Sequence, residues 1–430
     1  MLIKSILNRC HKFKSFVYGK AYFAEDEGRP VLKVEIVPRK NSKGICSKCH
    51  RPAPGYDRLG ERKFEFIPVW GFSVFFVYSM RRVECPTCGV GIEEVPWAEG
   101  KHHQTKTHMQ FLAHWAKKLS WKEVAESFHT TWPKVYHAVR YRVAWGLRHR
   151  DLSGITAIGI DELQWHKGHE YLTLVYQINA EAIRLLWIGR DRTVKTLLRF
   201  FRFIGKERSE RLQFVCSDMW KPYLKVIKKK ADEAIHILDR FHIVATIHKA
   251  IDEVRAEEYR KMKQDGHESV LKHSRWCLLK RKKNLTEKQE VKLKELLTYN
   301  LKSVRAYLLK EDFNGLWDYV SPSWAGKFLD RWCTRVMRSK IEPMKRVAKT
   351  IRTHQDLILN WFKAKKAYSC GIVEGLNNKV KVTTRKSYGF KSFKCTEIAL
   401  YHVLGKLPEP ESYHLRQSRR LETLRAPQRG

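Results

Sequence analysis

The spacing of apolar residues divides the chain into a strand-rich, a helical and an alternating part. Near the N-terminus, residues 16–23 and 31–37 are rich in β-branched and aromatic side chains and flank a turn-forming stretch, which predicts two strands. Residues 63–70 and 73–84 have the same character and predict a hairpin. From residue 105 to residue 148, apolar positions recur with the period of an amphipathic helix.

Local signals in this helical part predict a helix-turn-helix. Ser120 is placed to cap a helix, and Glu123, three residues later, completes a capping box. Residues 129–131 make a short break, and Pro133 suits the first turn of the next helix. That helix is expected to enter the major groove of DNA, with contacts from Thr131, Trp132, Lys134, Tyr136, His137 and Arg140. The alternative is a helical linker whose aromatic residues form a core.

Residues 151–242 alternate between strands and helices. Three strands joined by short polar turns must pair antiparallel, and a helix, a strand, a second helix and a fifth strand follow them. The predicted ranges are 155–163, 170–178, 184–190, 193–205, 211–218, 220–230 and 234–242. This is the order of an RNase H-like sheet, in which Asp161 and Asp218, at the ends of the first and fourth strands, lie side by side.

The rest of the chain is predicted to be helical. Residues 243–367 form a basic, all-helical insertion, whose charge runs are either solvated helix faces or a surface that tracks DNA. A further helix starts near Gly371. Glu374, Asn378, Lys381 and Arg385 share one face of it, because helical neighbours recur every three to four residues.

The predicted fold class is therefore multidomain α+β. A zinc-binding β unit precedes a helix-turn-helix, and an all-helical insertion interrupts an RNase H-like (integrase-like) catalytic core. The predicted segments are 1–100 (zinc-binding β domain), 101–150 (helix-turn-helix), 151–244 (catalytic core, first part), 245–367 (helical insertion), 368–405 (catalytic core, last part) and 406–430 (polar tail).

Composition adds a strong positive charge. The 430 residues include 84 Lys and Arg against 45 Asp and Glu, a formal net charge of +39. Such an excess favours a polyanionic partner, nucleic acid before an anionic membrane surface. No apolar run has the length of a membrane span, and the N-terminus has too short an apolar core for a signal peptide. We expect a cytoplasmic, nucleoid-associated protein of bacterial type.

Four of the ten cysteines are spaced as metal ligands. Cys46 and Cys49 form one Cys-x-x-Cys turn, and Cys85 and Cys88 form another. In a reducing compartment two such turns predict a tetrahedral, structural Zn²⁺ site. A redox role for either pair is the alternative, but no thioredoxin-like strand and helix surround them.

Three acids are candidates for metal-dependent chemistry on DNA. Cleaving a phosphodiester requires charge neutralisation at the attacking and leaving oxygens, which two Mg²⁺ ions ~4 Å apart supply. Hard cations such as Mg²⁺ or Mn²⁺ prefer carboxylate oxygens, and Asp161, Asp218 and Glu374 are placed to provide them. Each has a structural alternative: Asp161 as a strand-terminal cap, Asp218 as a helix N-cap and Glu374 as a partner of the helix dipole.

Several stretches carry a family resemblance: CSKC with CPTCG, LSWKEVAESF, GIDELQWHKGHEYLTLVY, FVCSDMWKPYLKVI, ILDRFHIV and GIVEGLNNKVKVTTRKSYGF. With them the chain resembles insertion-sequence DDE transposases of the ISL-three group. The resemblance implies that Asp161, Asp218 and Glu374 are the metal-binding triad, and that Asp239 and His242 support it. It also implies that the two N-terminal units recognise terminal inverted repeats.

The function predicted from the sequence is that of a DNA transposase. Metal-activated water would cut the strand at the element end, and the freed 3′-hydroxyl would attack target DNA. Lys381, Arg385 and Lys386, together with Asn378 on the same helix, would contact the DNA backbone. Bringing two ends together implies at least a homodimer. The alternatives are a non-transposing nuclease on the same fold, a zinc-dependent DNA-binding regulator, and an inactive or domesticated copy.

Overall fold

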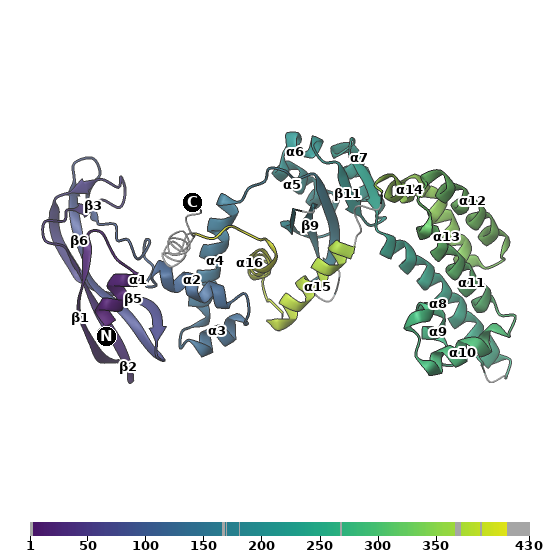
Figure 1. Cartoon of the computed structure of the whole chain (residues 1–430), viewed down its shortest axis with the longest axis horizontal. Coiled ribbons are helices and arrows are strands. Elements are labelled where there is room, and N and C mark those ends of the chain that lie inside the picture. Colours follow the sequence, from purple (N-terminus) through teal and green to yellow (C-terminus); the bar gives the residue numbers. More distant parts are fainter. Residues whose placement is uncertain are drawn as a thin grey trace, which may run out of the picture. The chain divides into compact units, whose positions relative to one another are not determined.

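The computed structural model describes residues 3–165, 168, 170–179, 181–266, 269–365, 371–387 and 389–410. The chain forms two compact units, and Figure 1 shows the elements of both. Unit 1 comprises residues 1–151 and 380–430, and unit 2 comprises Leu152–Lys379. Within the described residues, no helix combines the length and the apolar character that crossing a membrane requires.

Unit 1 begins with a five-stranded sheet, in which four strands have the order β1-β2-β6-β5 and the fifth, β7, pairs with β6. An aromatic core holds it together, with Phe66 stacked on Phe76 and Trp97 fully buried. The predicted hairpin is confirmed as β5 and β6, which pair antiparallel. The elements are α1 (Ile3–Cys10), β1 (Phe16–Asp26), β2 (Arg29–Pro38), β3 (Gly44–Ile45), β4 (Pro52–Ala53), β5 (Gly55–Val69), β6 (Phe72–Cys85) and β7 (Gly89–Ile92).

Three helices follow the sheet: α2 (Lys106–Trp115), α3 (Trp121–Ser127) and α4 (Trp132–His149). The predicted capping box of α3 is confirmed. The Glu123 amide donates to Ser120 Oγ at 3.2 Å, and the Ser120 amide donates to the Glu123 carboxylate at 2.7 Å. Pro133 lies in the first turn of α4, where its missing N–H is not needed.

The end of the described chain returns to these helices and completes unit 1. Helix α16 (Phe393–Leu404) packs on α4, and a β-carbon at Gly146 would lie 2.7 Å from Leu407 Cβ. The Glu409 carboxylate pairs with Lys117 at 2.8 Å and also with Arg142. The sequence had placed residues 368–405 in the catalytic core and residues from 406 in a polar tail. Instead, residues 380–410 pack with the N-terminal unit, and residues 411–430 lie outside the described part.

The sheet of unit 2 has the order β10-β9-β8-β11-β12. Its first three strands pair antiparallel and β8, β11 and β12 pair parallel, as the sequence predicts. One face packs against α5 and α7, through an apolar cluster that includes Ile158 and Ile160. The elements are β8 (Ala157–Gln164), β9 (Tyr171–Asn179), β10 (Ala182–Arg190), α5 (Val194–Ile204), α6 (Lys206–Glu210), β11 (Phe214–Ser217), α7 (Lys221–Lys230) and β12 (Ile235–Leu238).

The predicted all-helical insertion is present, with its own apolar core around Trp332 and Phe313. It meets the sheet where Asn360 Nδ2 donates to the backbone oxygen of His236 in β12, at 2.8 Å. Its elements are α8 (Arg240–Gln264), α9 (Arg275–Leu279), η1 (Lys282–Asn284), α10 (Glu287–Leu297), α11 (Lys302–Asn314), η2 (Gly315–Asp318), α12 (Pro322–Arg338), α13 (Glu342–Thr353) and α14 (Gln355–Lys363). Helix α15 (Gly371–Lys386) then returns to the sheet (Figure 1).

Candidate catalytic and metal-binding sites

Strand β8 presents Asp161 and Glu162 on opposite faces of the sheet, because successive side chains of a strand alternate. Ile158 and Ile160 face α5 and α7, and Glu162 shares their side of the strand. Gly159 and Asp161 face α15 instead. A β-carbon at Gly159 would overlap Val373 of that helix, so glycine allows α15 to lie close to the strand.

The side chain of Asp161 is held by a short chain of hydrogen bonds from the same face. Asn377 Nδ2, one helical turn beyond Val373, donates to Asp161 Oδ2. Tyr176 Oη, from the neighbouring strand, donates to Asn377 Oδ1 at 2.6 Å. The amide of Glu162 donates to Asp161 Oδ1 at 2.8 Å. Helix α15 is therefore fixed to β8 through the acid that the sequence singled out.

The surroundings of Asp161 act in opposite directions on its charge. Burial raises the pKa of the Asp161 carboxyl, and the nearby Asp218 carboxylate raises it further. The Glu162 amide, His242 and the Asn377 amide each lower that pKa. Asp161, Asp218 and His242 therefore lie within one electrostatic neighbourhood, although they come from two strand ends and a helix.

On the face of β8 opposite Asp161, Arg192 forms ion pairs with two acids, Glu162 and Asp218. Its Nε lies 3.1 Å from Glu162 Oε1, and its Nη2 lies 3.1 Å from Asp218 Oδ2. The guanidinium also stacks over Trp220, 4.4 Å from the ring centre. Burial, and then the charge of Asp218, raise the pKa of Glu162 to about 8. Asp218 also accepts from the Trp220 amide at 3.0 Å, but the N-cap of α7 is Trp220 itself, so Asp218 braces the turn before the helix without being its N-cap.

Glu374 lies in the first turn of α15, three residues before Asn377, and its side chain is exposed. Asn378, Lys381 and Arg385 are exposed as well, and Lys386 is half-buried. Asp161, Asp218 and Glu374 are not a group whose ligand atoms all lie within 4.8 Å of one another; among the described residues, only four cysteines form such a group. The helix of Glu374 is thus docked beside Asp161, but the three carboxyl groups do not converge on one point.

Asp239 and His242 lie at the start of α8, where the sequence had expected the end of a strand. Asp239 caps this helix, since its Oδ1 accepts from the Phe241 amide at 2.8 Å. His242 Nε2 lies 3.7 Å from Asp239 Oδ2. The Asp239 amide donates to the backbone oxygen of Ser217 at 2.8 Å, which places the pair next to the strand end that carries Asp218.

The residues of α4 and its N-cap that are predicted to contact DNA differ in their solvent exposure and in whether they are already paired. Thr131, Trp132, His137 and Arg140 are exposed. Tyr136 is half-buried and stacks against Trp132, with ring centres 5.5 Å apart. Lys134 is tied down: its Nζ lies 2.7 Å from the buried carboxylate of Glu65 in β5. This residue links α4 to the N-terminal sheet.

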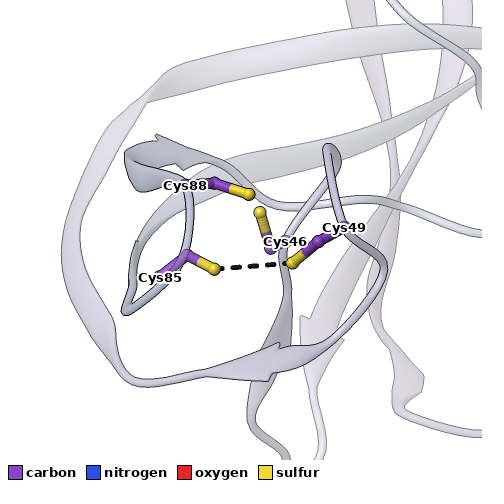
Figure 2. Close-up of side chains that lie close together, drawn as sticks. All are labelled: Cys46, Cys49, Cys85 and Cys88. Atoms are coloured by element: carbon purple, nitrogen blue, oxygen red, sulfur yellow. Dashed lines mark hydrogen bonds between the residues drawn. The ribbon is translucent and has the colours of Figure 1, made fainter.

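The four predicted zinc ligands do come together. The sulfur atoms of Cys46, Cys49, Cys85 and Cys88 all lie within 4.8 Å of one another, and Figure 2 shows their side chains pointing into a common space. Cys49 Sγ and Cys85 Sγ are 3.5 Å apart. Zn–S bonds of ~2.3 Å in a tetrahedron place sulfur atoms roughly 3.8 Å apart, so the cluster has the size of a zinc site.

Backbone amides favour the thiolate form of two of these cysteines. Those of Thr87 and Cys88 lower the pKa of the Cys85 thiol to about 7. Those of Cys49 and Lys48 lower the pKa of Cys46. Desolvation, followed by the neighbouring thiols, raises the pKa of Cys88 to about 12. Thiolates crowded in this way call for a cation among them, since a metal binds the deprotonated thiol.

Three residues near the candidate catalytic acids had no role in the sequence interpretation: Asn377, Tyr176 and Arg192. Asn377 and Asn378 are adjacent, and nothing local in the sequence tells which of the two asparagines turns inwards. A buried tyrosine in an apolar strand likewise looks like core. The charge of Arg192, in a chain with 84 Lys and Arg, carried no signal of its own.

Comparison of the sequence with known proteins identifies a family and several relatives. The transposase family model of the ISL3 (ISL-three) group matches residues 158–400, from β8 into α16. The transposase for insertion sequence element IS1001 of Bordetella parapertussis is 27% identical over 394 residues, which cover 91% of this chain and 96% of the relative. The transposase for insertion sequence element IS1557 of Mycobacterium tuberculosis is 29% identical over 427 residues, covering 91% of this chain and 93% of the relative. Since the family model spans more than half of the chain, the protein belongs to the ISL3-group DDE transposases.

Proposed function

We propose that this protein binds the terminal inverted repeats of an insertion sequence and catalyses metal-dependent strand cleavage and strand transfer into target DNA. The observation that carries the proposal is the docking of α15 on β8 through Asn377 and Asp161. It joins the helix of Glu374 to the strand of Asp161, beside the parallel strand that ends before Asp218. The strand order of this sheet supports an RNase H-like core.

The acids have the chemistry that a divalent cation requires. Asp161 and Asp218 offer carboxylate oxygens, the ligands of hard cations, and the charge of Asp218 adds to burial in raising the pKa of Asp161. A guanidinium already bridges Asp218 and Glu162, which indicates that this side of the site attracts positive charge. We assign Asp161, Asp218 and Glu374 as the residues that would hold Mg²⁺ or Mn²⁺. Glu374 would turn its exposed side chain towards Asp161 to complete the set.

The roles of the chain's own groups follow from where they lie. Bound divalent ions would supply the charge that activates water and stabilises the leaving oxygen. Asn377 holds Asp161 in one orientation, and Arg192 holds Asp218. Asn378, Lys381, Arg385 and Lys386 continue along α15 beyond Glu374, and we assign them to the DNA backbone.

The N-terminal unit would recognise the element ends. We assign the exposed residues Thr131, Trp132, His137 and Arg140 of α4 and its N-cap to base and backbone contacts, with Tyr136 supporting Trp132. Lys134 is already paired with Glu65, so it would contribute the least of these residues to DNA binding. The four cysteines would hold a structural Zn²⁺. Two copies of the chain would bring two ends together.

A strand-transfer assay with pre-cut ends tests the proposal. The cognate ends, Mn²⁺ and a target plasmid should give joined products with the natural chain. Asp161→Ala, Asp218→Ala and Glu374→Ala should each reduce the yield by roughly 10³-fold or more, as losses of groups that act as a unit do. Asp232→Ala, an exposed acid after α7, is the matched control. Undiminished joining by the three variants would refute the assignment.

The same assay separates the alternatives. A nuclease on this fold would hydrolyse DNA with Mn²⁺ and give no joined product. A zinc-dependent regulator would bind the ends and keep its function in all three acid variants, while Cys46→Ser would abolish it. An inactive copy would bind ends but neither cut nor join them.

A further inference from the structure

The helical insertion carries a groove that belongs neither to the candidate catalytic acids nor to the helix-turn-helix. It lies between α9 and the first turns of α10 and encloses about 920 Å³. Its lining combines apolar surface and one large aromatic side chain with several basic residues and a single acid, Glu295. The residues that matter here are Lys272, His273, Arg275, Trp276, Lys288 and Lys292.

The charge of this groove is only partly compensated. Arg275 pairs with Asp252 at 3.0 Å, and Lys292 pairs with Glu295 at 2.9 Å. Lys272 and Lys288 are exposed, and within the described part of the chain no carboxylate lies within the 4.0 Å of an ion pair from either amine. Two solvated ammonium groups therefore face the same open groove, a setting that attracts anions.

Trp276 gives the groove its second property. Its side chain is 52% exposed, although burial of an indole is strongly favourable. The Arg275 guanidinium lies 5.2 Å from its ring centre, which keeps a cation beside the ring. An accessible aromatic face between lysines matches how proteins bind unpaired nucleotides, with a base on the ring and phosphates on the cations.

We propose that this groove binds single-stranded DNA, with a base stacked on Trp276 and phosphates held by Lys272 and Lys288. The strand must be single, because a base in a duplex is already stacked on both faces. The groove is a site in addition to the one proposed for cleavage and joining. It uses none of the three acids, so it stands even if their metal-binding role fails.

Photocrosslinking of the full chain tests this site directly. The probe is a short single-stranded oligonucleotide that contains 5-iododeoxyuridine, used without added divalent ions. Irradiation followed by peptide mapping should place a major crosslink within residues 269–295. Trp276→Ala should remove that crosslink and weaken binding roughly 5- to 100-fold, the range for one stacked base. Replacing both Lys272 and Lys288 with Gln should lower the slope of log K against log salt by about 1.4.

Another exposed tryptophan of the same insertion provides the control. Trp324 in α12 is 58% exposed and has Lys327 Nζ 4.6 Å from its ring centre. Trp324→Ala and Lys327→Gln should leave the crosslink and the affinity unchanged. The proposal is overturned if the crosslinks fall outside residues 269–295, if the Trp324 and Trp276 variants lose equal affinity, or if a duplex competes as well as the single strand.

Discussion

At the scale of single residues, the neighbours of Asp161 fix the orientation and the charge of this candidate metal ligand. Its carboxylate is buried, which disfavours its charge, yet Asn377, the Glu162 amide and His242 all favour that charge. Asn377 is in turn oriented by Tyr176. A carboxylate that accepts hydrogen bonds from two directions keeps one orientation, and a metal ligand needs a fixed orientation.

Asn377→Ala should weaken divalent-ion binding. Without the amide, the Asp161 carboxylate is free to rotate, and loss of such a supporting group typically costs about 10- to 100-fold in metal affinity. Calorimetric titration of Mn²⁺ into the DNA-free protein measures the effect. Asn378→Ala, the exposed neighbour, is the matched control. Equal affinities for the two variants would remove the supporting role from Asn377.

His236 makes the stability of unit 2 sensitive to acid. The ring is buried and its Nε2 lies 2.8 Å from Ser217 Oγ, and burial lowers its pKa to about 4. In the unfolded chain the pKa of a histidine is about 6.5. The folded state therefore binds this proton less readily, and stability is lost as the pH falls from about 6.5 towards 4.

His236→Gln should remove that part of the acid sensitivity. Between pH 7 and pH 5, the wild-type free energy of unfolding should fall by about 2 kcal/mol more than that of His236→Gln, from the linkage between protonation and folding. Urea unfolding at the two pH values measures the difference. The exposed His137→Gln should keep the wild-type pH dependence; if it changes as much as His236→Gln, burial is not the cause.

Among the elements, the short strands β3, β4 and β7 depend on the cysteine cluster. They are two to four residues long, and the apolar cluster around them consists of Cys46, Ala53, Val83 and Cys85, with Cys49 and Cys88 packed against it. Such strands have too little core to be stable alone. Bound metal would supply the missing stabilisation.

Cys46→Ser should therefore release the zinc and loosen these strands. Elemental analysis should find one Zn²⁺ per chain in the wild type and less than one in the variant, with faster amide exchange in β3, β4 and β7. Cys395→Ser lies outside the cluster and should retain the metal. Full zinc occupancy in Cys46→Ser would contradict the four-thiolate site.

Besides the packing of Leu407 on Gly146, an ion-pair centre at Glu409 ties the segment after α16 to the N-terminal helices. Arg142 is 8% exposed and pairs with Glu409, which also binds Lys117. Glu409→Gln would leave Arg142 buried without a full counter-charge. The free energy of unfolding should fall by about 1–2 kcal/mol, less than for a fully buried pair because Glu409 is 43% exposed.

Thermal unfolding of the full chain, followed at unit 1, measures this loss. Glu126→Gln removes an exposed pair with Lys122 in the same unit and should cost less than about 0.5 kcal/mol. If Glu409→Gln costs no more than Glu126→Gln, the segment is not held by this pair.

Elements with a local signal could be predicted from the sequence, and those defined by distant packing could not. The capping box at Ser120 and Glu123 and the strand that carries Asp161 depend on residues close together in the chain. The turn of Asn377 towards Asp161 depends on where α15 meets β8. Likewise, nothing near Leu407 indicates that it packs against Gly146.

For the molecule as a whole, positive charge is the dominant property. With a net charge of +39, binding to DNA should release many counterions. Affinity for a duplex should fall by roughly 10³-fold or more between 50 and 200 mM salt. Replacing Lys381 and Arg385 with Gln should reduce the slope of log K against log salt by about 1.8. Fluorescence anisotropy measures both, and an unchanged slope would exclude phosphate contacts from these two residues.

Unit 1 is assembled from two stretches that lie far apart in the sequence, and its described residues fall within 3–151 and 380–410. This has a consequence during translation. When α4 leaves the ribosome, α16 has not yet been synthesised, so the packing surface around Gly146 stays uncovered while the whole of unit 2 is made. Unit 1 therefore matures last, although residues 1–151 precede unit 2 in the chain, and a nascent chain interrupted within the helical insertion would never complete it.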